Sequence, residues 1–271
     1  MKHSVALYLN VAHQIEWREA AIAGFKRHGL APVVASYARP VNCDLVVLWG
    51  TRRKEILQKQ KAIGGRALIF ERGYFSDRYV RTSVGYDNLN GRANFYNKGM
   101  NSSRWELYGG ELKKWRTGGE EVVIAGQVQG DMSCSGIILK SLYTNIVKEL
   151  REIGVENVTF KPHPLARVNS GPDGVRVTDN ISKASCVVSY NSNFAVDCVI
   201  GGVPVITLDK GSMAWDVSGH SLKDVFNLKY PDRRQWAYDL AYTQWLKTEI
   251  ANGDMWDHLK QGMESRMGNV L

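Results

Sequence analysis

The sequence predicts an α/β protein made of two Rossmann-like domains that face a cleft. Short apolar, β-branched runs alternate with helix-like segments twice along the chain, and polar residues follow several of these runs. Paired glycines at positions 118 and 119 separate the two series. We therefore expect a first domain over residues 1–118 and a second over residues 119–271, the second carrying the C-terminal helices.

The first series begins with the apolar run Val5–Leu9, and an amphipathic stretch from Gln14 to His28 follows it as a predicted helix. Gly29 marks the expected helix end. Further strands are expected at 32–36, 44–49 and 67–70, with a basic helix at 52–62. Residues 72–119 are irregular and rich in Gly, Asn, Tyr and Arg, and so long a loop region usually has a function.

The second series begins with the strand-like run Glu121–Ala125 and a predicted helix over 137–153. Strands are then expected at Val158–Phe160, Cys186–Val188 and Val203–Leu208, and residues 232–259 indicate one or two helices. Neither half contains a GxGxxG or P-loop motif, which argues against dinucleotide and ATP binding.

The bulk composition is that of a globular protein without a membrane span. No apolar run approaches the roughly 20 residues that cross a bilayer. The first residues lack the apolar core of a signal peptide, and none is expected. The four cysteines show no CxxC spacing, and Cys43, Cys186 and Cys198 lie in apolar surroundings. We therefore expect buried free thiols in a cytoplasmic protein rather than disulfides or a zinc site.

Charge is divided unevenly along the chain. Residues 1–118 hold 20 Lys and Arg against 9 Asp and Glu, which gives +11, whereas residues 119–271 hold 15 against 18, which gives −3. The basic half could attract a polyanion such as DNA, or an anionic membrane surface. A solvated surface without a partner is the alternative.

In the second half, polar residues follow the predicted strands at the edge where open α/β sheets bind ligands. We expect a phosphate-bearing ligand there, since helix-start N–H groups attract anions. The candidates are Gln127, Lys161, His163, Ser189, Asn191, Ser192, Asn193 and Asp197, together with Asp131 and Ser133. Structural alternatives remain: a histidine fixed in a Pro-bounded turn, ordinary helix caps, and an exposed aspartate.

In the first half, Glu71 follows a predicted strand, where a carboxylate could act as general base toward an acceptor hydroxyl. The arginines expected around it are Arg72, Arg78, Arg81 and Arg92. A structural Glu–Arg pair is the equal alternative. The polar loop from Gly85 to Arg92, which includes Asn90, could hold the acceptor or complete the donor site.

These motifs resemble those of the Kdo-transferase-like glycosyltransferases of capsule synthesis and their phage-encoded relatives, which have the GT-B type of fold. The resemblance covers roughly residues 66–217. The matching segments are Glu71–Tyr74, Arg81–Gly85, Gly126–Val128 with Asp131 and Ser133, the Lys-Pro-His-Pro of 161–164, Ser189–Val205 and Met213–Asp216. The sequence departs from the family at Arg72, where those enzymes have a second acidic residue.

The resemblance implies a nucleotide-sugar donor, a UDP- or CMP-sugar, bound by the second half, with Glu71 and Asp131 as catalytic carboxylates. No cofactor or metal is expected, because no DxD-like pair stands where a metal-bound sugar nucleotide would need one. The arginines and Asn90 are assigned to the acceptor.

The loop 85–93, together with Tyr190–Asn193, looks more like the short phage group, which glycosylates hydroxymethylated DNA bases in the host cytoplasm. With the basic first half, this favours DNA as the acceptor. The target base would leave the duplex and could stack on Tyr74, Phe75, Tyr79 or Tyr86. The alternatives are a Kdo-type or other surface-glycan transferase, a nucleotide-sugar epimerase, and a non-catalytic DNA- or glycan-binding protein.

Overall fold

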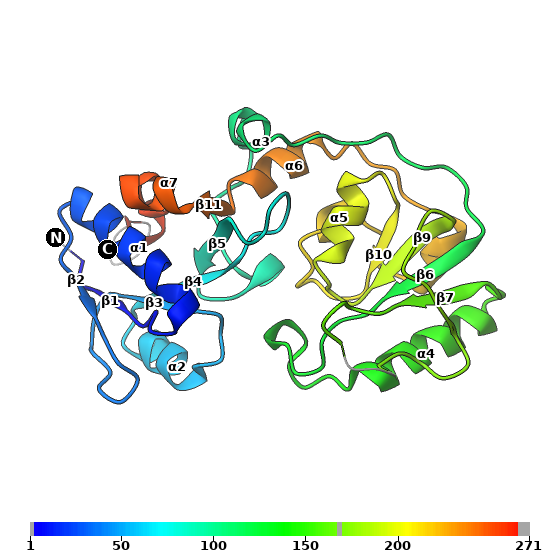
Figure 1. The fold of residues 1–271 in the computed structure, drawn as a ribbon, viewed down its shortest axis with the longest axis horizontal. Helices are drawn as coiled ribbons and strands as arrows, with labels where there is room; N and C mark the ends of the chain where they lie inside the picture. Colours follow the sequence, from blue (N-terminus) through cyan, green and yellow to red (C-terminus); the bar gives the residue numbers. More distant parts are fainter. Residues whose placement is uncertain (1–2, 167–169, 265–271) are drawn as a thin grey trace, which may run out of the picture. The chain divides into compact units, whose positions relative to one another are not determined.

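The structure, a computed structural model, describes residues 3–166 and 170–264. The chain forms two compact units and enters the first of them twice (Figure 1). Unit 1 contains the described residues up to Tyr108 and from Tyr238 onward, and unit 2 runs from Gly109 to Ala237. The expected division near residue 118, with the C-terminal helices in the second domain, therefore differs from these units. The physical reason is that the C-terminal segment adds a strand and helices to unit 1.

Unit 1 is built on a six-stranded sheet with strand order β11-β5-β4-β3-β1-β2. The strands from β4 to β2 run parallel, whereas β5 is antiparallel to both of its neighbours. The strands are β1 (Val5–Leu7), β2 (Pro32–Val34), β3 (Leu45–Trp49), β4 (Arg66–Arg72), β5 (Arg81–Tyr86) and β11 (Gln244–Leu246). The four parallel strands are the Rossmann-like part that the apolar runs predict.

Helices cover both faces of this sheet. Successive side chains of a strand point to opposite faces, so the apolar runs make both faces apolar. Leu7 and Val47 pack against one layer of helices, which includes Phe25 and Trp256, while Val46 packs with Ile56 on the other face. The helices are α1 (Ile15–Arg27), α2 (Lys54–Ala62), α3 (Ser103–Leu107), α7 (Lys247–Asn252), α8 (Asp254–Leu259) and α9 (Gln261–Glu264). α6 (Arg234–Ala241) contains the point at which the chain returns to unit 1.

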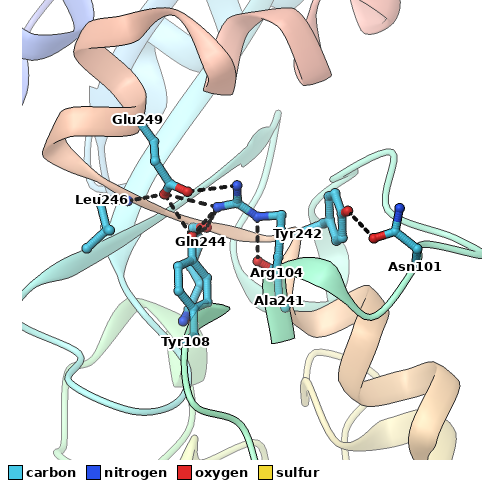
Figure 2. A network of polar contacts seen from close by, with 8 residues as sticks. All are labelled: Asn101, Arg104, Tyr108, Ala241, Tyr242, Gln244, Leu246 and Glu249. Atoms are coloured by element: carbon cyan, nitrogen blue, oxygen red, sulfur yellow. Dashed lines mark hydrogen bonds and ion pairs between the residues drawn. The ribbon is translucent and has the colours of Figure 1, made fainter. Parts of the chain in front are cut away.

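Polar contacts fix the C-terminal segment within unit 1 (Figure 2). Arg104 of α3 meets the carboxylate of Glu249 in α7, and Tyr108 donates its hydroxyl proton to the same carboxylate over 2.8 Å. Gln244 of β11 accepts the N–H of Tyr74 through its side-chain oxygen over 2.7 Å. The segment therefore also shapes the loop that follows β4.

Unit 2 is built on a five-stranded parallel sheet with strand order β10-β9-β6-β7-β8. The strands are β6 (Glu121–Ala125), β7 (Val158–Lys161), β8 (Arg176–Val177), β9 (Ala184–Ser189) and β10 (Val205–Thr207). Because all strands are parallel, their carboxyl ends lie along one edge of the sheet. The loops that leave this edge carry most of the polar residues singled out in the sequence.

Two helices flank this sheet and bury its β-branched residues. Tyr143 and Ile146 of α4 (Leu139–Glu152) pack on one face, and Ala195 and Val199 of α5 (Phe194–Ile200) pack on the other. Single turns of 3-10 helix complete the connections of both units: η1 (Ala12–Gln14), η2 (Asn90–Arg92), η3 (Met132–Cys134), η4 (Trp215–Val217) and η5 (Leu222–Phe226). In the described part of the chain, no helix combines the length and apolarity that a bilayer crossing requires.

Candidate functional site

In unit 2, three loops at the carboxyl edge of the sheet meet in a network of buried side-chain amides. Gln127, after β6, donates from Nε2 to Asn191 Oδ1 over 2.8 Å, and its Oε1 accepts the backbone N–H of Asn191 at 3.2 Å. Asn191, after β9, donates from Nδ2 to Asp209 Oδ2 over 2.7 Å. Gln127 and Asn191 are only 5% and 4% exposed, so the network lies beneath the surface of this edge.

The loop after β6 carries Asp131 on a short turn. The carboxylate caps η3, with Oδ1 accepting the Ser133 N–H at 3.2 Å, which confirms the capping contact that the sequence left open. The backbone oxygen of Ser133 accepts a second proton of Asn191 Nδ2 over 2.7 Å. The Asp131 side chain is nevertheless exposed, so a substrate can reach it.

Lys161 and His163 lie at the end of β7, next to the end of β6. The Leu165 N–H donates to His163 Nδ1 at 3.1 Å, which places the proton of the neutral ring on Nε2. A Cβ at Gly126 would lie 2.8 Å from Phe160 Cζ and 3.1 Å from the backbone nitrogen of His163, so the missing side chain lets the two loops approach. Lys161 donates from Nζ to the backbone oxygen of Asp179 over 2.7 Å.

The start of α5 differs from the open phosphate seat that the sequence predicts. The Ser189 hydroxyl oxygen accepts the Ser192 N–H at 2.9 Å, and the Ser192 hydroxyl oxygen accepts the Phe194 N–H at 3.3 Å. The expected free N–H groups are therefore partly occupied by serine side chains of the same segment. Asn193 is half-buried at the N-cap, and Asp197 is exposed in the first turn of α5.

In unit 1, Glu71 lies near the end of β4 and is half-buried. Its Oε1 accepts the Arg72 N–H at 2.9 Å, and its Oε2 is 3.6 Å from the point where a Cβ on Gly50 would sit. Burial and the nearby Glu71 charge raise the pKa of Tyr74, which keeps this phenol protonated. The Tyr74 hydroxyl donates to Asn90 Oδ1 at 3.2 Å, so Asn90 joins the surroundings of Glu71.

The arginines of this region are spread among aromatic partners. The guanidinium of Arg72 lies 4.7 Å from the centre of the exposed Tyr79 ring, and that of Arg81 lies 4.2 Å from the Tyr108 ring. Arg78 is half-buried in the loop between β4 and β5, and Arg92 is exposed at the end of η2.

The aromatic residues proposed to stack on a base occupy different environments. Tyr74, Phe75 and Tyr86 are between 1% and 3% exposed, and the Phe75 ring lies 4.8 Å from that of Trp105. Tyr79 alone among the four is exposed, at 73%. Core packing, rather than stacking on a ligand, accounts for the other three.

Comparison with solved structures adds the fold relationship. No protein-family model matches the sequence, and no curated protein matches it. The β-Kdo 2,4-transferase KpsC of Thermosulfurimonas dismutans matches with a TM-score of 0.54 at 14% identity, covering 89% of this chain and 91% of that one. The chain shares the fold of a Kdo transferase. The predicted class, α/β with two Rossmann-like units as in GT-B glycosyltransferases, is thereby confirmed.

Two further structures are more distant. The β-Kdo 2,7-transferase KpsC of the same organism gives a TM-score of 0.48 at 17% identity, covering 95% of this chain and 99% of that chain. A putative UDP-N-acetylglucosamine 2-epimerase from Listeria monocytogenes gives a TM-score of 0.27 at 10% identity, covering 98% of both chains.

The charge asymmetry is smaller when it is counted by unit than when it is counted by sequence half. Unit 1 of the full sequence holds 20 Lys and Arg against 13 Asp and Glu, which gives +7, and unit 2 holds 15 against 14, which gives +1. Acidic residues of the C-terminal segment, such as Asp239 and Glu249, account for part of the change. The electrostatic case for a polyanion is therefore weaker than the sequence halves indicate.

Two residues of the site region escaped the sequence analysis. Asp209 follows β10 and anchors Asn191, and its place after a strand-like run is the same signal that selected Asp131. Tyr143 of α4 accepts the Gln127 N–H with its hydroxyl oxygen at 2.7 Å, and a helix-face tyrosine gives no comparable signal.

Among the described residues, no group of three His, Cys, Asp or Glu side chains is arranged to hold a metal ion.

Proposed function

We propose that this protein is a GT-B-type glycosyltransferase that moves a sugar from a nucleotide-sugar donor to an acceptor hydroxyl. One observation carries the proposal: an exposed carboxylate, Asp131, and a histidine with Nε2–H, His163, occupy the carboxyl edge of the unit 2 sheet. This is the edge where open α/β sheets bind their ligands. The fold shared with a β-Kdo 2,4-transferase supports the reaction class.

For the donor, we propose a nucleotide-activated sugar of the Kdo kind, CMP-Kdo being the first to test. His163 can donate from Nε2 to a phosphate oxygen, and Lys161 brings a positive charge to the same strand end. Of the side chains assigned to donor binding from the sequence, Ser189 and Ser192 cap their own loop, and Gln127 and Asn191 bond to each other. Donor contact therefore rests chiefly on His163, Lys161 and the exposed Asp197.

For catalysis, we propose Asp131 and Glu71 as the reacting carboxylates. Asp131 is held at the edge of unit 2 by its own cap, yet it remains accessible. Glu71 is held in unit 1 by the Arg72 N–H and would accept the proton of the acceptor hydroxyl. Charge on the leaving phosphate would be met by His163 and Lys161, so we expect activity without an added metal ion.

For the acceptor, we propose a hydroxyl of a surface glycan in preference to DNA. The +7 charge of unit 1 is modest, and three of the four aromatic residues considered for base stacking are buried. The half-buried Arg81 and Asn90 and the exposed Arg72 offer polar contacts that suit sugar hydroxyl or carboxylate groups. Arg78 and Arg92 complete the acceptor candidates.

The test is a transfer assay with radiolabelled CMP-Kdo and a panel of UDP-sugars, in EDTA, with three acceptor conditions. A Kdo-bearing glycan should be labelled, and the Asp131→Asn variant should lose the transfer. Label appearing only on hydroxymethylated DNA would overturn the acceptor, and sugar isomerisation without an acceptor would indicate an epimerase. If no donor shifts the melting temperature of the protein and none reacts, the function itself is wrong.

A further inference from the structure

We propose that Asn191 is a positioning residue, which ties the turn carrying Asp131 to the ends of β9 and β10, and not a contact to the donor. This assignment concerns the same edge of unit 2 and, for its catalytic consequence, rests on the proposed function. It differs from the sequence prediction, in which the Ser/Asn segment binds the donor directly.

The side-chain amide of Asn191 has no proton left for a ligand. An amide nitrogen carries two protons, and Nδ2 lies 2.7 Å from both the Ser133 backbone oxygen and Asp209 Oδ2. Both partners can only accept, so the atom that faces them must be the NH2 group. The amide oxygen accepts from Gln127 Nε2 at 2.8 Å. A phosphate oxygen, which needs an N–H donor, could be contacted by this amide only if one of the two Nδ2 bonds broke.

The contact to Ser133 acts directly on the turn that holds Asp131. Within this turn, Cys134 N–H donates to the Asp131 backbone oxygen at 3.1 Å, and Ser133 N–H donates to the Asp131 carboxylate at 3.2 Å. The Asn191 amide therefore binds the turn at Ser133, two residues along the chain from Asp131. Without this hydrogen bond, the turn would keep its internal bonds but lose this link to the end of β9.

Asp209 restricts the movement of the Asn191 side chain. Its Oδ2 accepts the Gly211 N–H at 3.1 Å as well as the Asn191 amide, so the loop after β10 holds the carboxylate in place. Gln127 also holds Asn191, since it donates to the Asn191 amide oxygen over 2.8 Å and accepts the Asn191 backbone N–H at 3.2 Å. A residue fixed by the loops of three strand ends can set the position of Asp131 to the accuracy that catalysis needs.

The catalytic arm of the test compares steady-state kinetics of Asn191→Ala with those of the wild type. Misplacing a catalytic group by about 1 Å costs about 100-fold, so kcat should fall by about that factor. KM for the donor should change by less than about threefold, since the donor is not contacted. An unchanged kcat, or a raised KM at unchanged kcat, would overturn the proposal.

The matched control is Asn157→Ala. Asn157 also donates its amide to a backbone oxygen, that of Glu120 at 2.6 Å, but it precedes β7 and lies at the opposite edge of the same sheet. Its kcat and KM should equal those of the wild type. An equal loss of kcat in both variants would mean that any amide contact to this sheet has the same effect, which would also overturn the proposal.

A second arm does not depend on activity. Hydrogen–deuterium exchange of the peptide that spans residues 128–137 should become faster in Asn191→Ala and stay at the wild-type rate in Asn157→Ala. Asp209→Ala should also accelerate it, and Asp209→Asn, which retains an acceptor oxygen, should restore most of the protection. Unchanged exchange in Asn191→Ala would overturn the positioning role. If the exchange changes but the wild type transfers no sugar, the proposed function fails while the structural role stands.

Discussion

Arg104 and Glu249, which are 145 positions apart in the sequence, form a two-point ion pair within unit 1. Nη1 lies 2.9 Å from Oε1 and Nη2 lies 3.1 Å from Oε2, with side-chain exposures of 11% and 13% (Figure 2). Arg104 also donates to the Gln244 backbone oxygen at 2.8 Å, and the Leu246 N–H donates to the same carboxylate at 2.7 Å. The pair therefore fixes β11 and α7 where the chain has returned to unit 1.

Replacing Arg104 by Ala should destabilise unit 1 strongly. The change leaves the buried Glu249 carboxylate without its cation, and breaking such a pair from one side costs about 3–5 kcal/mol. Urea unfolding of the variant should show this loss as a lower midpoint.

The exposed pair of Lys148 and Glu152 provides the matched control. Its atoms lie 3.8 Å apart on α4, and its side chains are 75% and 62% exposed. Lys148→Ala should change the free energy of unfolding by no more than about 0.5 kcal/mol, because water screens such pairs. Similar losses in the two variants would contradict the account of the buried pair.

Gly24→Ala should lower stability although alanine is the better helix former. Intrinsic propensity favours Ala in the middle of α1 by about 1 kcal/mol. A Cβ at this position, however, would lie 2.0 Å from the Ile250 backbone oxygen and 3.4 Å from Gly253 Cα, so α7 would have to move. We expect a net loss of about 1–3 kcal/mol in urea unfolding. A higher midpoint would show that α7 is not fixed against α1.

The local pattern predicted the parallel strands apart from the two-residue β8, but not the elements that depend on distant partners. Glu121–Ala125 was predicted with its observed bounds because it contains the β-branched run Val122–Ile124. The sequence of β5 predicts a loop, because Thr82, Ser83 and Gly85 do not form an apolar run. The segment is buried as a strand because β4 and β11 flank it. β11 consists of three residues in a helix-like stretch, and only its pairing with β5 defines it.

The site shows the same division. The order of strands and loops was enough to bring Gln127, Asp131, His163 and Asn191 to one edge of the sheet, since parallel strands share a carboxyl end. The sequence could not show which of these side chains use their hydrogen-bonding groups in contacts with each other. Asn191 and Ser189 have the polarity of ligand-binding residues, and only the fold reveals that their donors and acceptors are engaged.

Replacing His163 by Ala should weaken donor binding. The proposed contact is a hydrogen bond from Nε2 to a charged phosphate, and such a bond is worth about 1.5–3 kcal/mol, or roughly 10- to 150-fold in Kd. Isothermal titration with CMP or CMP-Kdo measures the change directly. The same substitution at His3, in unit 1, should leave the affinity as it is. Equal affinities for the wild type and His163→Ala would remove His163 from the donor site.

The stability of unit 2 should fall in alkaline solution. Burial raises the pKa of the Cys186 thiol from 9.0 to about 12, and burial likewise raises the pKa of Tyr143 from 10.0 to about 12. Both groups stay protonated in the folded protein while the unfolded chain ionises first. Their contribution is therefore complete below about pH 9 and is lost as the pH rises toward 12. The urea midpoint followed at a series of pH values measures this decline.

Cys186→Ala isolates the contribution of the thiol. The variant starts from a lower midpoint, because a fully buried side chain has been shortened. Its midpoint should then decline less steeply than that of the wild type above about pH 9, since one ionising group has been removed. Burial also keeps the thiolate scarce, so the native protein should react slowly with a thiol reagent at about pH 8, and denaturant should expose all four thiols. Identical pH slopes for the wild type and the variant, or rapid labelling of Cys186 itself in the native protein, would mean that Cys186 is not buried in the core.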